Sequence, residues 1–316
     1  MIIGSHTGDN LLAEYEHVTT TFNIQTKVIR LITDNASNNL SAFSQLILPG
    51  FELYFEQEDG DDSEEDEYEA TRVSPIEDED EEDDPIDSSN GTEEFVRLPC
   101  FIHTIQLVVQ DGLREGACIR STMAKVAAIA KLSHKSTLIA EQLHEINVSI
   151  PTPVATRWNS QYLTASRILD VPNATLTRLL TEQKHCELIL SVKDISILRE
   201  FLSIFALFAE ATIQTQTGSN VSISMVAPSV LGIYFDLENE AKVCKYTGSL
   251  CTSLLKSLKQ RFGGLLLNLD IPVSSSLKHR NTFSLFSDEI FLISTFVDAQ
   301  FKLRWITQSE LEDAIK

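Results

Sequence analysis

One acidic segment divides this chain into two parts. Residues 56–94 contain 21 Asp and Glu residues and a single basic residue, Arg72. The segment carries −20 of the chain's net charge of −21, so all other residues together carry only −1. Like charges at this density repel one another, and the segment has few apolar side chains to bury. We therefore expect 56–94 to be a disordered insertion, with the folded core built from the residues on either side.

The residues before the insertion predict a helix, a strand and a second helix. Apolar residues recur at helical spacing over 9–22 and again over 36–47. Between them, "KVIRLIT" (27–33) is rich in β-branched residues and apolar on both faces, which is typical of a buried central strand. This order is that of an α/β layer.

Asp34 lies between the predicted strand and the second helix, and two interpretations of it remain open. The stretch "TDNASNN" (33–39) is rich in residues that cap helix N-termini, so Asp34 could be such a cap. Alternatively, a carboxylate at the end of a buried strand is held rigidly. Together with one or two further carboxylates, it could then bind a pair of Mg²⁺ ions.

After the insertion, the sequence predicts a short strand up to about Cys100 and then almost only helices. The predicted helices cover 101–113, 119–132, 135–146, 157–170, 174–190, 194–215, 224–240, 248–262 and 287–296. Stretches such as "GGLLLNLDIPVSSS" (263–276) separate some of them. The second half is therefore expected to be a helical array, without a second sheet.

Cys100 and His103 are three residues apart at a predicted helix start, so their side chains share one face. A zinc ion needs four ligands, and no second closely spaced Cys/His pair is present. A half-buried histidine with a backbone partner is the simpler interpretation of His103.

Arg157 and Trp158 open another predicted helix. Trp158, Tyr162 and Leu169 fall on one helical stripe, which is typical of a core anchor. An exposed indole beside a guanidinium could instead stack on an unpaired base while the arginine holds phosphate. From the residues alone the core anchor is the favoured interpretation of Trp158, and base stacking stays open as the alternative.

Five segments in order resemble the hAT superfamily of transposases and its domesticated relatives, which include BED-zinc-finger-containing proteins. They are "HTGDNLLAEYEHVTTTFNIQTKVIRLITDNASNNLSAF" (6–43), "CFIHTIQLVV" (100–109), "TRWNSQYLTASRIL" (156–169), "FLSIFALFAEATIQTQTGSNVSISMVAPSVLGIYFDLEN" (201–239) and "FVDAQFKLRWI" (296–306). Together they span nearly the whole chain outside the acidic segment.

The resemblance implies a predominantly helical protein of class α/β plus α, in which an RNase H-like core is split by an all-helical insertion domain. Residues 1–55 would form the first part of that core, and 95–170 the remainder with the entry to the insertion. The helical insertion domain would then cover 171–316.

The resemblance also implies roles for the motif residues. Asp34 would be the second of three metal-binding carboxylates. Cys100, His103, Arg157 and Trp158 would form the DNA-binding set, with His103 near a flipped base and Trp158 stacked on it. Because the resemblance places Arg157 and Trp158 at the rim of the site, and because the pair begins a helix, we expect the Trp158 ring to be exposed.

The family's first acid lies upstream of His6, and its last acid lies beyond the helical insertion, just before a dimerisation region. Glu310 and Glu312 follow the "FKLRW" segment too closely to take the last position. We therefore expect a partial core in which Asp34 is vestigial, without the BED finger or the dimerisation region. Mg²⁺ would be needed only by an intact parent enzyme.

Three functions remain open. The first is a catalytically inactive, transposase-derived protein with a regulatory or interaction role in the nucleus. The second is a fragment of an active hAT-type transposase. The third is a helical scaffold whose acidic segment, 56–94, binds basic proteins. We expect this chain to bind DNA weakly or not at all, because it has no basic stripe and the residues outside 56–94 carry a net charge of only −1. The five scattered cysteines favour a reducing compartment, and no membrane span or signal peptide is predicted.

Overall fold

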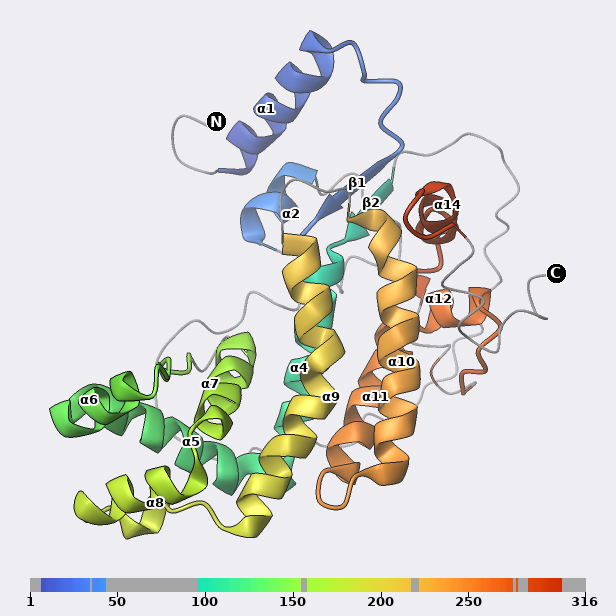
Figure 1. The fold of residues 1–316 in the computed structure, drawn as a ribbon. Coiled ribbons are helices and arrows are strands. Elements are labelled where there is room, and N and C mark those ends of the chain that lie inside the picture. The colour runs from blue at the N-terminus through green and yellow to red at the C-terminus, as the bar shows by residue number, and fades with distance from the viewer. Residues whose placement is uncertain are drawn as a thin grey trace, which may run out of the picture. The chain divides into compact units, whose positions relative to one another are not determined.

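A computed structural model describes residues 7–34, 36–43, 96–154, 158–216, 222–274, 277 and 284–302 (Figure 1). The acidic segment 56–94 lies outside these residues, so the prediction that it is disordered stays a prediction. Arg157, Glu310 and Glu312 also lie outside them. The described chain is predominantly helical and divides into two compact units, Met1–Leu98 and Pro99–Lys316.

The first unit contains the predicted helix, strand and helix. Helix α1 (Gly8–Thr21) begins after Thr7, whose hydroxyl accepts a hydrogen bond from the amide of Asn10. Strand β1 (Arg30–Thr33) and helix α2 (Ser37–Phe43) follow, and β2 (Val96–Pro99) pairs with β1. Helices α1 and α2 pack together, with the rings of Tyr15 and Phe43 edge to face at 5.7 Å.

The prediction that β1 is buried on both faces is wrong. The side chain of Ile32 is 43% exposed, and Ile29, just before the strand, is 41% exposed. Within the described part of the chain the sheet has two strands, and no second layer covers Ile32. β-branched residues favour a strand regardless of its burial, so composition alone could not distinguish a central strand from a half-exposed one.

The second unit begins with α4, directly after β2, and its α-helices follow the predicted order. They are α4 (Phe101–Glu115), α5 (Ala117–Lys135), α6 (Thr137–Glu145), α7 (Trp158–Asp170), α8 (Asn173–Glu182), α9 (Val192–Gln216), α10 (Val226–Val243), α11 (Gly248–Arg261), α12 (Gly263–Asn268) and α14 (Ile290–Val297). Two short 3₁₀ turns, η2 (Cys186–Leu188) and η3 (Ile223–Met225), precede α9 and α10.

Helices α4, α9, α10 and α11 run alongside one another, while α5 and α7 pack on α9 (Figure 1). The apolar face predicted for α4 is buried, since Ile105, Val108 and Val109 have no exposed surface. Phe201, Phe205 and Phe208 project from α9 into the core, each 1% exposed or less. These aromatic side chains bury large areas and account for much of the hydrophobic stabilisation of the unit.

One feature of the second unit differs from the prediction. Helix α12 occupies residues that the glycines of "GGLL" (263–266) had suggested were a linker. Gly263 and Gly264 are buried, and the helix is held by packing rather than by helix propensity. Helices α5 and α7 contact α9 within this unit, and the boundary expected at residue 170 stays a prediction.

No helix within the described residues is both long enough and apolar enough to cross a bilayer.

Candidate functional site

Asp34 lies at the junction between β1 and α2, and its carboxylate contacts the start of that helix. Its Oδ1 accepts hydrogen bonds from the amide of Ala36, at 3.2 Å, and from Nδ2 of Asn39, at 2.6 Å. The first contact closes an Asx-turn, in which the side chain replaces a backbone acceptor. Asp34 therefore orders the turn that leads into α2, although it accepts no backbone N–H of that helix and is not its N-cap in the strict sense.

Arg97 of β2 places a buried guanidinium beside Asp34. The residue is only 2% exposed. Its Nε donates to Oγ1 of Thr33 at 2.5 Å, and its Nη2 donates to the backbone carbonyl of Asp34 at 2.8 Å. Burial lowers the pKa of Arg97 to about 10, and the nearby charge of Asp34 opposes this shift. The guanidinium thus remains protonated at neutral pH and supplies a positive charge next to the carboxylate.

This arrangement is poorly suited to a divalent cation. A metal ion at Asp34 would compete with two hydrogen bonds and would approach a buried positive charge. Mg²⁺ sites also need several oxygen ligands in near-octahedral geometry. Among the described residues, no group of three His, Cys, Asp or Glu side chains is arranged to hold a metal ion. The residues near Asp34 fit a structural junction and do not fit a Mg²⁺ site.

Cys100 and His103 lie in the second unit, at the start of α4, and are both half-buried. Cys100 is the N-cap residue of this helix, although its side chain makes no capping hydrogen bond. Its carbonyl accepts a hydrogen bond from the hydroxyl of Thr104 at 3.1 Å. The two candidate residues are thus on one helical turn, as their spacing predicted.

Trp158 contradicts the prediction of an exposed indole, because its side chain is only 5% exposed. The ring lies 5.7 Å from the ring of Phe205 and 6.4 Å from that of Phe208, both on α9, and 6.5 Å from that of Tyr162. Helix α7 begins at Trp158 and packs on α9, which turns the first side chain of α7 inward. In this structure Trp158 is a core anchor, and its faces are not available to stack on a base.

The indole N–H of Trp158 is also buried. No acceptor among the described residues lies within hydrogen-bond distance of its Nε1. A buried donor without a partner reduces stability. The stabilising contribution of Trp158 therefore comes from the size of its ring and not from its N–H group.

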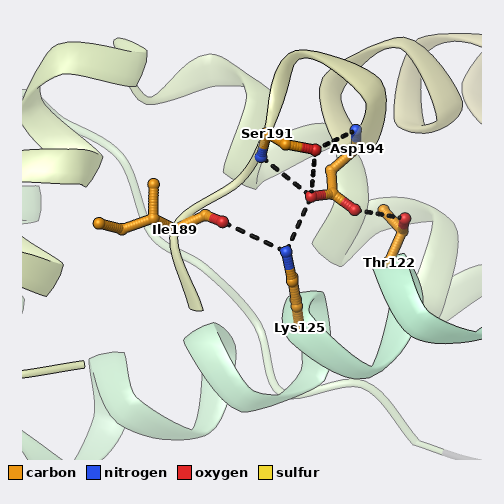
Figure 2. A network of polar contacts seen from close by, with 5 residues as sticks. All are labelled: Thr122, Lys125, Ile189, Ser191 and Asp194. Atoms are coloured by element: carbon orange, nitrogen blue, oxygen red, sulfur yellow. Dashed lines mark hydrogen bonds and ion pairs between the residues drawn. The ribbon is translucent and has the colours of Figure 1, made fainter. Parts of the chain in front are cut away.

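A polar network surrounds Asp194 at the start of α9 (Figure 2). Its Oδ2 accepts hydrogen bonds from the amide and hydroxyl of Ser191, at 2.9 and 2.7 Å, and from Nζ of Lys125, at 2.8 Å. Its Oδ1 accepts one from the hydroxyl of Thr122 at 2.7 Å, and Lys125 also donates to the carbonyl of Ile189. Asp194 is 6% exposed.

These contacts stabilise the ionised carboxylate of Asp194 and give it a structural role. Burial alone would raise the pKa of Asp194, but the hydrogen bonds from Lys125, Ser191 and Thr122 outweigh it and hold the pKa well below its ordinary value. The hydroxyl of Ser191 in turn accepts from the amide of Asp194, which makes a reciprocal cap at the start of α9. The network joins α5 to α9. It was not predicted, although the Ser-x-x-Asp spacing of "SVKD" (191–194) is a capping signal that could have revealed part of it.

A second carboxylate, Glu200, holds the turn between α10 and α11. It accepts hydrogen bonds from the amides of Lys245, Tyr246 and Thr247, at 3.0–3.1 Å, and from the hydroxyl of Thr247 at 2.7 Å. Burial raises the pKa of Glu200, and these hydrogen bonds lower it by more, so the net shift is downward. The buried Asp194 and the half-buried Glu200 of α9 are therefore used to fix neighbouring elements and are not free to act as general bases.

No protein-family model matches this sequence, and no curated protein matches it. The resemblance to hAT transposases therefore depends on the order of the five sequence motifs.

Proposed function

We propose that this chain is a transposase-derived protein that does not cleave DNA and acts in the nucleus by binding other molecules. Descent from the hAT superfamily is part of the proposal, together with an RNase H-like origin of the first unit. The order of the five motifs supports the descent, and a β-strand and helix unit followed by a helical unit is compatible with it.

The observation that carries the proposal is the environment of Asp34. Its carboxylate closes an Asx-turn before α2 and holds the side chain of Asn39, and a buried guanidinium lies beside it. A catalytic metal-binding acid needs a free carboxylate and partner acids. The burial of Trp158 adds to this, since the indole that would stack on a flipped base packs against Phe205 and Phe208.

The alternative of an active hAT-type transposase predicts metal-dependent cleavage. The test incubates the chain with a duplex carrying hAT-type terminal repeats and with Mg²⁺ or Mn²⁺, in parallel with an Asp34→Asn variant. We expect no hairpin formation or strand transfer from either protein. Cleavage by the wild type that Asp34→Asn abolishes would show that Asp34 is a working catalytic acid.

The other alternative is a helical scaffold whose acidic segment, 56–94, binds basic proteins such as histones. The charge of −20 over this segment favours it. Deleting 56–94 distinguishes binding through the acidic segment from binding through the folded units. Loss of all partner binding would favour the scaffold that binds through its acidic segment, whereas binding that survives the deletion must use the folded units.

A further inference from the structure

Two cysteines meet at the junction between α10 and α11, and both are free thiols. Cys244 is the C-cap residue of α10, and Cys251 lies near the start of α11. The thiol of Cys251 donates a hydrogen bond to the sulfur of Cys244. The thiol of Cys244 in turn donates to Oε2 of Glu240 at 3.4 Å. The fold thus places the two sulfur atoms side by side, which the scattered cysteines of the sequence did not indicate.

The backbone between the two cysteines is held in place. The carboxylate of Glu200 accepts hydrogen bonds from the amides of residues 245–247, at 3.0–3.1 Å. The amide of Cys251 donates to the carbonyl of Thr247 at 3.1 Å. Because these contacts order the junction, the two thiols meet without a search through other conformations. Groups held together in this way react with a high effective concentration.

The two thiols differ in their access to solvent. Cys244 is half-buried, whereas Cys251 has no exposed surface. A dissolved oxidant therefore reaches the sulfur of Cys244 first. The sulfur of Cys251 is then in position to react with its oxidised neighbour.

The surroundings of the pair keep both thiols protonated at neutral pH. Burial is the main cause that raises the pKa of Cys244 and of Cys251, and the carboxylates of Glu240 and Glu200 add to the rise. Since the thiolate is the nucleophile, both thiols react slowly at neutral pH and faster as the pH rises. The pair therefore suits a slow response to sustained oxidation and not a fast signal.

We propose that Cys244 and Cys251 form a site of reversible oxidation, at which hydrogen peroxide converts the two thiols into a disulfide that links α10 to α11. The thiolate of Cys244 attacks one peroxide oxygen, so an S–O bond forms, the O–O bond breaks, and the leaving hydroxide takes up a proton. The sulfur of Cys251 then attacks the sulfenic acid of Cys244. The S–S bond forms, the S–O bond breaks, and a second water leaves.

Two electrons pass from the sulfur atoms to the peroxide in this sequence, and two thiols with one hydrogen peroxide give one disulfide and two waters. A cellular thiol reverses the reaction by exchange. In a reducing compartment the pair therefore stays reduced until an oxidant arrives. This inference depends neither on transposase ancestry nor on the proposed binding role.

The test treats the reduced full chain with hydrogen peroxide at pH 7 and at pH 9. The chain is then unfolded, the remaining thiols are blocked with N-ethylmaleimide, and a tryptic digest is analysed by mass spectrometry. Trypsin cleaves after Lys245, between the two cysteines, so the disulfide joins peptide 243–245 to peptide 246–256. We expect this linked pair after oxidation and its loss after dithiothreitol. It should form at least about tenfold faster at pH 9, because the thiolate fraction is larger.

Variants assign the two roles. Cys251→Ala should leave Cys244 as a sulfenic acid that dimedone traps, and Cys244→Ser should leave the buried Cys251 reduced. Cys186→Ser is the matched control, since it removes an exposed cysteine and should keep the linked peptides. Circular dichroism shows that each variant is folded.

The wild-type chain alone can overturn the proposal. Absence of the linked peptides at pH 9 would do so, and so would a disulfide from Cys244 or Cys251 to another cysteine in their place. Trapping of Cys251 by dimedone in Cys244→Ser would contradict the order of attack and would overturn the proposed reaction.

Discussion

Replacement of Trp158 tests whether this side chain belongs to the core or to a binding surface. The indole is 5% exposed and lies against Phe205 and Phe208. Trp158→Ala removes most of that contact and leaves a cavity between α7 and α9, so we expect a loss of about 3–5 kcal/mol in the free energy of unfolding. A surface indole that only contacts DNA would cost less than about 1 kcal/mol.

Trp158→Phe separates the size of the side chain from its polarity. Phenylalanine keeps most of the aromatic contact but loses volume, which costs about 1–2 kcal/mol in a packed core. It also removes a buried N–H that has no acceptor among the described residues, and such a donor costs about 1–3 kcal/mol. The two terms oppose each other, so we expect Trp158→Phe to lie within about 1 kcal/mol of wild type.

The assay is urea unfolding followed by the far-ultraviolet circular dichroism of the helices, most of which belong to the second unit. Leu163→Ala is the matched control, since Leu163 is on the same helix and 45% exposed, and it should cost less than about 1 kcal/mol. A small effect of Trp158→Ala would refute the core assignment. An equal loss in Trp158→Phe and Trp158→Ala would mean that the indole N–H has a partner.

Three further predictions concern the packing and charge of the second unit. Asp194→Asn should lower the free energy of unfolding by about 2 kcal/mol at pH 7. Because the folded-state pKa of Asp194 is lowered, its contribution is present above the ordinary aspartate pKa of about 3.9 and is lost as the pH falls below it. The difference in the free energy of unfolding between wild type and Asp194→Asn should therefore become smaller from pH 5 to pH 3. A difference that stays constant over this range would contradict the prediction. Gly112→Ala should destabilise by about 1–2 kcal/mol, because its Cβ would lie 2.7 Å from Cγ of buried Leu254, which outweighs the gain in helix propensity. Gly232→Ala has room for its Cβ and should stabilise by up to about 1 kcal/mol; a destabilised Gly232→Ala would count against the packing described for α10.

The helices were predictable because their signal is local. Each amphipathic helix repeats apolar residues along one face, and that face is visible in any short window of sequence. The helix α4 shows this, with Ile105, Val108 and Val109 all fully buried. Helix α12 was missed for the same reason, since its glycines carry the local signal of a linker and its helical form depends on packing within the unit.

The candidate site was less predictable because it depends on contacts between distant residues. Arg97 is 63 residues from Asp34 in sequence, and no short pattern joins them. A charged residue within the apolar strand "FVRLP" (95–99) was the only hint of a buried guanidinium. Lys125 and Asp194 are likewise 69 residues apart. The burial of Trp158 could not be read from its position at a helix start, because the direction of α7 is set by its packing on α9.

We infer that the carboxylate of Asp34 orders the turn before α2 and does not hold a catalytic metal ion. Titration of Mn²⁺ into the full chain, with free Mn²⁺ followed by electron paramagnetic resonance, tests it directly. The acidic segment 56–94 binds some Mn²⁺ weakly in any variant, so only the difference between wild type and Asp34→Asn is informative. We expect the two titration curves to coincide. A site in the wild type that Asp34→Asn weakens tenfold or more would contradict the claim.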